Sequence, residues 1–124
     1  LYDGILIKEN HIAAAGSIAA ALKAAKDTAA PGLLVEIEVE NLQQLQEALA
    51  AGAGRILLDN FDLERLRAAV REARGRAQLE VSGGVTLANV RAIAETGVDY
   101  ISVGDLTKNV TAVDLSLRFE RTPR

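Results

Sequence analysis

Short apolar runs alternate with helical stretches along this chain, and this alternation limits the possible fold more than any other feature. The runs have the composition of buried β-strands and span residues 4–8, 33–39, 55–58, 78–81 and 100–103. The segments between them have helical periodicity and span residues 17–26, 42–51, 63–73 and 87–95. Such alternation favours a parallel sheet with right-handed crossovers. We therefore predict an α/β fold, a partial parallel β/α barrel (TIM-like) with five strands and four intervening helices.

The length limits how much of a barrel the chain can contain. It has 124 residues, whereas a complete eight-unit barrel needs about 250. We find no linker and no second domain. Because the chain begins at Leu1 and contains no methionine, we interpret it as a segment of a longer reading frame or an edited sequence.

Composition argues against several classes of function. The 14 basic residues are dispersed, the net charge is −3 and only two Phe and two Tyr could stack on bases, so we expect no nucleic-acid partner. Without cysteine, and with His11 as the single histidine, we expect no thiolate nucleophile, Cys-based zinc site or multi-histidine metal centre. No apolar run approaches the roughly twenty residues of a membrane span. We predict a cytoplasmic protein with no membrane partner.

The carboxyl end of each predicted strand carries a residue suited to an anionic or phosphorylated substrate. These ends are Lys8, Glu38, Asp59, Ser82 with Gly83 and Gly84, and Gly104. In a parallel α/β barrel the active site is built where the strands end. The coincidence therefore predicts an enzyme site, or part of one.

The loop Ser82-Gly83-Gly84 and the residue Gly104 predict a phosphate site. We expect Thr86 to cap the helix after the first loop, so that backbone N–H groups face an anion at the positive end of that helix. Barrels often hold a phosphate between two consecutive loops of this kind. The alternative is that the glycines only make tight turns between strand and helix. Because two consecutive loops share the pattern, we favour the phosphate site.

Three carboxylates, Glu36, Glu38 and Glu40, alternate with apolar residues and should project from one face of their strand. Facing outward they would meet the covering helices, and facing inward they would crowd the barrel interior, where unpaired charge is unfavourable. A carboxylate near the carboxyl end of the strand avoids this conflict because it reaches the open mouth of the barrel. There it could bind sugar hydroxyls or a metal.

Asp59 ends the next strand in a position corresponding to that of Glu38. Carboxylates on adjacent strand ends can hold a ribose diol, bind Mg²⁺ directly or through water, and stabilise positive charge that develops at a sugar carbon. The alternative is that Asp59 or Asn60 simply caps the helix that begins near Asp62. We favour the carboxylate pair.

Lys8 and His11 leave the first strand close together, and both could pair with a carboxylate or a phosphate. A lysine at the end of an apolar run is more often an edge residue whose charge reaches water, and a lone histidine is more often structural. Their spacing and the chemistry of the other strand ends favour a substrate role for Lys8 and a weaker one for His11.

Five stretches, in this order and at this spacing, closely resemble a known family. They are LIKENHIAAAGS, VEIEVEN, ILLDNF, LEVSGGV and ETGVDYISVG. The family is quinolinate phosphoribosyltransferase, also called nicotinate-nucleotide diphosphorylase (carboxylating), and the resemblance spans nearly the whole chain. It implies that quinolinate reacts with phosphoribosyl pyrophosphate to give nicotinate mononucleotide, pyrophosphate and carbon dioxide in de novo NAD biosynthesis.

The resemblance also implies an architecture and a cofactor. Members of the family use Mg²⁺ and fold as an incomplete barrel beside an N-terminal α/β domain. They form dimers in which one subunit's N-terminal domain helps to close the partner's site, so we expect a homodimer or higher homo-oligomer. Residues 1–124 would then be the C-terminal part of the barrel domain, with the N-terminal domain and the first barrel strands lying upstream of them.

Residue roles follow by position from the same resemblance. Lys8 resembles the lysine that contacts the quinolinate carboxylate, while Glu38 and Asp59 resemble the acids that hold the ribose and its metal. The loops that resemble those binding the sugar phosphate contain Ser82, Gly83, Gly84 and Gly104. The family supplies further arginines and a histidine from segments upstream of Leu1.

Asp105 departs from the family pattern, because we expect a small neutral residue beside the phosphate loop. Its carboxylate would repel phosphate if it points inward, and donors in the segment 107–109 could compensate. We expect the isolated chain to be inactive because it bears half of a substrate site. The alternatives are a fragment or engineered half-barrel whose two open edges and apolar interior make it self-associate, or a related barrel phosphoribosyltransferase with another acceptor.

Overall fold

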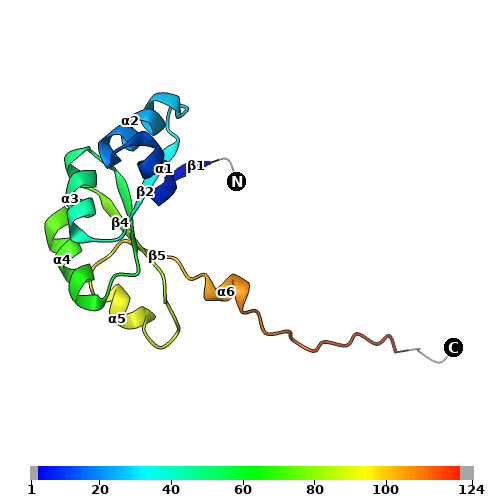
Figure 1. Cartoon of the computed structure of the whole chain (residues 1–124). Helices are drawn as coiled ribbons and strands as arrows, with labels where there is room; N and C mark the ends of the chain where they lie inside the picture. The colour runs from blue at the N-terminus through cyan, green and yellow to red at the C-terminus, as the bar shows by residue number, and fades with distance from the viewer. Residues whose placement is uncertain (1–2, 121–124) are drawn as a thin grey trace.

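The computed structural model describes residues 3–120, and its centre is a five-stranded parallel sheet in the order β1-β2-β3-β4-β5 (Figure 1). The strands are β1 (Gly4–Ile7), β2 (Leu34–Val39), β3 (Arg55–Asp59), β4 (Gln78–Ser82) and β5 (Tyr100–Ile101). Each strand pairs with the next one along the chain, which is the neighbour order of a β/α barrel. The predicted α/β fold and partial parallel barrel are confirmed.

Helices connect the strands as expected, with two additions. They are α1 (Glu9–Ala15), α2 (Ile18–Thr28), α3 (Leu42–Ala50), α4 (Leu63–Ala73), α5 (Val90–Ala94) and α6 (Asp105–Lys108). The short helices α1 and α6 were not predicted, since each begins directly after a strand end that we interpreted only as a source of site residues. α5 begins three residues later than expected, and β5 is shorter than the apolar run that predicted it.

One face of the sheet packs against helices α2, α3 and α4, which lie along one side of it in Figure 1. Every second residue of each strand points into this interface and packs against the apolar side chains along one side of each helix. The largest fully buried side chains are Leu22, Ile37, Val39, Leu45, Ile56, Leu58, Leu66 and Val81. This single core fixes which residues of each strand point the other way.

The opposite face, which we call the open face, carries the remaining strand residues. Glu36 and Glu38 project there because the intervening Ile37 and Val39 are fully buried on the helical side. The expectation of an apolar interior is therefore wrong for the central strands, where an ionic cluster around Arg55 occupies this face. Charge is tolerated there because oppositely charged groups lie in contact.

The segment after α6 runs as an extended, exposed tail that leads away from the sheet in Figure 1. Within the part of the chain that the structure describes, no helix has both the length and the apolar character to cross a membrane.

Candidate active site

The carboxyl ends of the strands meet at one edge of the sheet, as parallel pairing requires. Asp59 at the end of β3 lies directly opposite Ser82 at the end of β4. The backbone N–H of Asn60 donates to the carbonyl oxygen of Ser82 over 3.0 Å, which joins the two strand ends beyond the ladder. The structure thus brings the predicted acids and the predicted phosphate loop to a common edge.

Lys8 and Glu38 form an ion pair at this edge. The Nζ atom of Lys8 donates to Oε2 of Glu38 over 2.8 Å, with the lysine side chain 48% exposed and the glutamate 11% exposed. This hydrogen bond raises the pKa of Lys8; burial opposes the rise, and the charge of Asp59 adds to it. Lys8 therefore reaches across the strand ends to Glu38 and is not simply an edge residue whose charge lies in water.

Asp59 does not cap the following helix. The carboxylate of Asp62 does so, accepting a hydrogen bond from the backbone N–H of Arg65 over 2.8 Å. The Oδ2 atom of Asp59 instead accepts from the side-chain amide of Asn60 over 2.8 Å. Asn60 has a positive φ of 55°, and this turn separates the end of β3 from the start of α4. The helix-cap alternative for Asp59 is excluded.

His11 lies in the first turn of α1, and its ring bonds to the backbone. Its Nδ1 atom accepts a hydrogen bond from the N–H of Lys8 over 3.0 Å, which braces the turn between β1 and α1. The ring also lines an apolar hollow of about 450 Å³ between β1 and helices α1 and α2. These contacts give His11 a structural role, and none of them joins its ring to Glu38 or Asp59.

The two predicted phosphate loops line one hollow of about 310 Å³. Its lining residues are Ser82, Gly83, Gly84, Val85, Thr86, Ser102, Gly104, Asp105 and Lys108. Gly83 has a φ of +89° and sits against Asn60, so that a Cβ atom built there would lie 2.7 Å from the Asn60 Cγ. The loop therefore requires glycine at this position to reach close to the end of β3.

The expectation that Thr86 caps a helix behind the loop is wrong. α5 has five residues and begins at Val90, so the loop is separated from the helix by one more turn. Asn89 shapes that turn: its Oδ1 accepts from the N–H of Thr86 over 2.8 Å, and its Nδ2 donates to the Gly84 carbonyl over 2.9 Å. An anion in the hollow would thus meet loop N–H groups, without the N-terminus of a long helix.

Asp105 and Lys108 both line this hollow, as we expected from their positions. The Oδ1 atom of Asp105 accepts a hydrogen bond from the side-chain amide of Asn109, one turn further along the chain. Lys108 supplies a cation on the same wall. The pair leaves the hollow with one charge of each sign.

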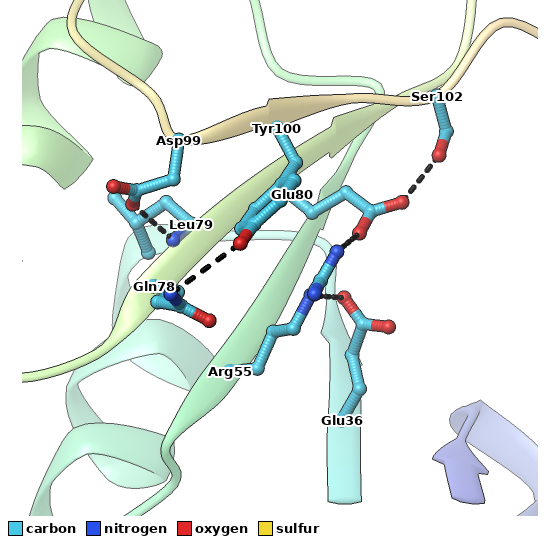
Figure 2. Close-up of polar contacts among 8 residues, drawn as sticks. All are labelled: Glu36, Arg55, Gln78, Leu79, Glu80, Asp99, Tyr100 and Ser102. Atoms are coloured by element: carbon cyan, nitrogen blue, oxygen red, sulfur yellow. Dashed lines mark hydrogen bonds and ion pairs between the residues drawn. The ribbon is translucent and has the colours of Figure 1, made fainter. Parts of the chain in front are cut away.

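Sequence reasoning missed a cluster on the open face, centred on Arg55 (Figure 2). The Nε atom of Arg55 lies 3.3 Å from Oε1 of Glu36, and its Nη2 donates to Oε2 of Glu80. The other oxygen of Glu80 accepts a hydrogen bond from the hydroxyl of Ser102. The guanidinium carbon lies 3.9 Å from the centroid of the Tyr100 ring. The strand register, which puts Glu36 opposite Arg55, brings these residues together, and no motif in the sequence marks the pairing.

The two glutamates of this cluster have opposite pKa shifts. Burial raises the pKa of Glu36, and the neighbouring negative charge of Glu80 raises it further, against the attraction of Arg55. Burial also disfavours ionised Glu80, but hydrogen bonds from Ser102 and Arg55 outweigh it and lower the pKa of Glu80. Of the two carboxyl groups, Glu36 is therefore the one that takes up a proton first as the pH falls.

The donor set at the edge fits Mg²⁺ only as a partial site. Among residues 3–120 there is no group of three or more His, Cys, Asp or Glu side chains that could hold a metal ion. Glu38 and Asp59 offer two oxygen ligands on adjacent strands, and Mg²⁺ commonly takes one or two carboxylates together with substrate phosphates and water. The residues therefore suit a metal ion that arrives with a phosphorylated substrate.

Comparison with known proteins identifies the family. The model of the quinolinate phosphoribosyl transferase C-terminal domain matches residues 1–118. The chain belongs to this family. The probable nicotinate-nucleotide pyrophosphorylase (carboxylating) of Bacillus subtilis is 45% identical over 117 residues, covering 94% of this chain and 40% of that protein. The Mycobacterium leprae nicotinate-nucleotide pyrophosphorylase (carboxylating) is 47% identical over 120 residues, with 94% and 42% covered.

Solved structures of the phosphoribosyltransferase family agree with this assignment. The nicotinate-nucleotide pyrophosphorylase from Francisella tularensis superposes with a TM-score of 0.84 at 51% identity, covering 94% of this chain and 41% of that one. The chain thus spans about two fifths of the length of the relatives it matches.

Proposed function

We propose that this quinolinate phosphoribosyltransferase domain serves the transfer of a phosphoribosyl group from phosphoribosyl pyrophosphate to quinolinate, giving nicotinate mononucleotide for NAD biosynthesis. The observation that carries the proposal is the shared edge of the sheet, where an acid pair stands beside a glycine-lined hollow. Asp59 and Ser82 are register partners at the ends of β3 and β4, so the acid lies beside the phosphate loop.

The hollow suits the 5-phosphate of the donor. Gly83 and Gly84 have positive φ and no side chains, so a phosphate oxygen can approach the loop backbone closely. Lys108 adds a cation on the same wall, while Asp105 works against it. Phosphate held here would place the ribose over the ends of β2 and β3.

The acids suit the chemistry at the ribose. Glu38 and Asp59 would accept hydrogen bonds from the ribose hydroxyls and stabilise the positive charge that develops as the bond between the anomeric carbon and pyrophosphate breaks. The bonding electrons leave with pyrophosphate, and the pyridine nitrogen supplies the pair for the new bond. Mg²⁺ held by Glu38 and Asp59 would neutralise charge on the leaving group.

Lys8 suits the acceptor. Its ammonium group lies 2.8 Å from Glu38 and about half of its side chain is exposed, so it can exchange this partner for a carboxylate of quinolinate. Once the nitrogen of the acceptor carries the sugar, its positive charge stabilises the electron pair that departing carbon dioxide leaves on the adjacent ring carbon. The ring carbon then takes a proton, and nicotinate mononucleotide is complete.

We also propose that residues 1–124 form the C-terminal part of a larger barrel domain in a cytoplasmic homodimer or higher homo-oligomer. Coverage supports the larger barrel domain, because the relatives extend well beyond the matched segment. The location and the oligomer rest on the family resemblance. In this arrangement the remaining cations for quinolinate come from segments outside residues 1–124. His11 would contribute to the site indirectly, through the backbone of Lys8.

The test is a quinolinate-dependent assay of pyrophosphate release in the presence of Mg²⁺. It is made on residues 1–124 together with the rest of the proposed barrel domain, and on three variants of that protein. Glu38→Gln and Asp59→Asn remove acid charge at the edge and should lower kcat by about a hundredfold or more. Glu47→Gln, on the exposed side of α3, is the matched control and should leave kcat unchanged. Equal rates for all of them would overturn the proposal, and transfer to another acceptor alone would favour a related phosphoribosyltransferase.

Self-association is a second candidate property of residues 1–124 taken alone. β1 and β5 are the edge strands of the sheet, and Leu6 and Leu34 are 38% and 41% exposed near the β1 edge. Such edges pair readily with further strands. Sedimentation velocity over a concentration series tests it: a constant mass of one copy would contradict self-association.

A further inference from the structure

Strand β5 is held to the sheet by little backbone pairing, although the loop that follows it forms one wall of the hollow. Its ladder with β4 contains two residue pairs. Before the ladder, the backbone N–H of Asp99 donates to the Leu79 carbonyl over 2.9 Å, and the N–H of Leu79 donates to Oδ2 of Asp99 over 2.7 Å. After it, the backbone N–H of Ser102 donates to the Val81 carbonyl over 2.8 Å. The position of Gly104 therefore depends on what else fixes β5.

Tyr100 of β5 and Ser102, the residue directly after this strand, both contact the cluster around Arg55. The Tyr100 ring stacks on the guanidinium, with the carbon 3.9 Å from the ring centroid, and the Ser102 hydroxyl donates to Glu80 (Figure 2). Glu80 is 8% exposed, and both of its oxygens are used, one by Ser102 and one by Arg55. The cluster thus connects β2, β3, β4 and β5.

Ser102 joins this cluster to the hollow. It lines the hollow together with Gly104, two residues further along the chain. Because its single hydroxyl proton is donated to Glu80, Ser102 cannot at the same time donate to a phosphate oxygen. Its contact with the site is therefore an anchor for the loop and not a ligand for the anion.

We propose that Arg55 and Glu80 are positioning residues that fix β5 through Tyr100 and Ser102, and thereby hold the Gly104 loop opposite the Ser82–Gly84 loop in a geometry ready for a sugar phosphate. This inference rests on the proposed function for the identity of the ligand. It gives the ionic contacts around Arg55 a role in substrate binding, because they would fix the position of the Gly104 loop before the ligand arrives.

Three variants each remove or weaken a different contact of the cluster around Arg55. Ser102→Ala removes the hydroxyl anchor, Glu80→Gln weakens both of its partners, and Arg55→Met removes the guanidinium. Arg91→Met, which breaks an exposed pair with Glu95 on α5, is the matched control. Ser102→Ala keeps the proposal testable if the charge-changing variants fail to fold, since it deletes one oxygen.

The first readout is independent of activity. Amide hydrogen exchange of Ser102, whose N–H is bonded to Val81, should accelerate about tenfold or more in Glu80→Gln and Ser102→Ala. The second readout is the binding and turnover of phosphoribosyl pyrophosphate with Mg²⁺. In these two variants Kd and KM should rise about tenfold, while kcat changes less than about threefold. In the double variant Glu80→Gln/Ser102→Ala, Kd should exceed that of the weaker-binding single variant by less than about twofold.

The outcomes distinguish this inference from the proposed function. If the unchanged protein does not bind phosphoribosyl pyrophosphate, the proposed function fails, while the exchange measurement still tests the anchoring of β5. If the unchanged protein binds it and folded Ser102→Ala and Glu80→Gln match the Arg91→Met control in Kd and in exchange, the positioning role is overturned. Independent, additive losses in the double variant would also overturn it.

Discussion

Alanine at Gly83 should disturb both halves of the site at once. Gly83 has a φ of +89°, and a Cβ atom there would lie 2.7 Å from the Cγ of Asn60 and 3.1 Å from its backbone nitrogen. Asn60 would have to move, and its side-chain amide is the group that donates to Asp59. A methyl group in the phosphate loop would therefore displace an acid of the neighbouring strand.

Gly84 is the matched control for the size of this effect. It also has a positive φ, +63°, but a Cβ atom there would meet nothing within 4 Å. Alanine at Gly84 should therefore lose only the backbone preference, about 1 to 2 kcal/mol of unfolding free energy. Alanine at Gly83 adds overpacking, typically about 1 to 3 kcal/mol, so its total should be about 2 to 5 kcal/mol.

Urea unfolding of the two variants measures the difference, and titration with phosphoribosyl pyrophosphate measures the effect on the site. Gly83→Ala should be the less stable variant and the weaker binder, and Asn60→Gly in the same chain should restore part of the stability by removing the clashing side chain. Equal unfolding free energies for Gly83→Ala and Gly84→Ala, or no rescue by Asn60→Gly, would refute the reasoning.

Three further predictions concern charge. Asp105→Asn removes the anion that lines the phosphate hollow and should lower the Kd for inorganic phosphate several-fold at low ionic strength, as titration calorimetry would detect. Glu38 raises the pKa of Lys8, so the stabilisation by this pair is fully present below the unfolded pKa of about 10.4 and is lost as the pH rises through the higher folded pKa. Ligand binding should therefore show no Lys8-dependent loss up to pH 9, which a comparison with Lys8→Met checks. Burial and the charge of Glu80 raise the pKa of Glu36, so ionisation of Glu36 destabilises the folded chain. Glu36→Gln should therefore increase the free energy of unfolding, measured in urea, at pH 8 but not at pH 4. A larger increase at pH 4 than at pH 8 would contradict this.

The sequence was sufficient to predict the strand ends because two independent signals agree there. Apolar alternation locates each strand to within a few residues, and the polar residue that follows marks where it leaves the core. Lys8, Glu38 and Asp59 could be placed at a common edge for this reason, before any contact between them was known. Their ion pair and hydrogen bonds then follow from the parallel order of the strands.

Two parts of the site could not be predicted in the same way. The Asn89 turn after the phosphate loop depends on side-chain bonds to Thr86 and Gly84, and it competes with an equally reasonable cap at Thr86. In the second part, Arg55 contacts Glu36, which lies 19 positions from it in the sequence, and Glu80, which lies 25 positions from it. Only the strand register brings these three residues together. The carboxylate of Glu36 inside a predicted strand looks unfavourable from the sequence, but in the structure it is paired with Arg55 on the neighbouring strand.

The charges at the edge favour one of the two ligands in the proposed reaction. The described residues place the cations Lys8 and Lys108 there. The carboxylates are those of Glu38, Asp59 and Asp105, with Glu9 and Glu40 lining a hollow beside Glu38. Because carboxylates outnumber cations, the edge does not attract a free dicarboxylate such as quinolinate, whereas a metal-bound pyrophosphate brings its own positive charge.

Residues 1–124 should therefore bind phosphoribosyl pyrophosphate with Mg²⁺ more tightly than quinolinate alone, and omission of Mg²⁺ should weaken donor binding. Calorimetric titration of each ligand separately, with and without the metal, measures this order. Tighter binding of quinolinate in the absence of donor and metal would show that the acceptor subsite, and not the donor subsite, lies mainly within this chain.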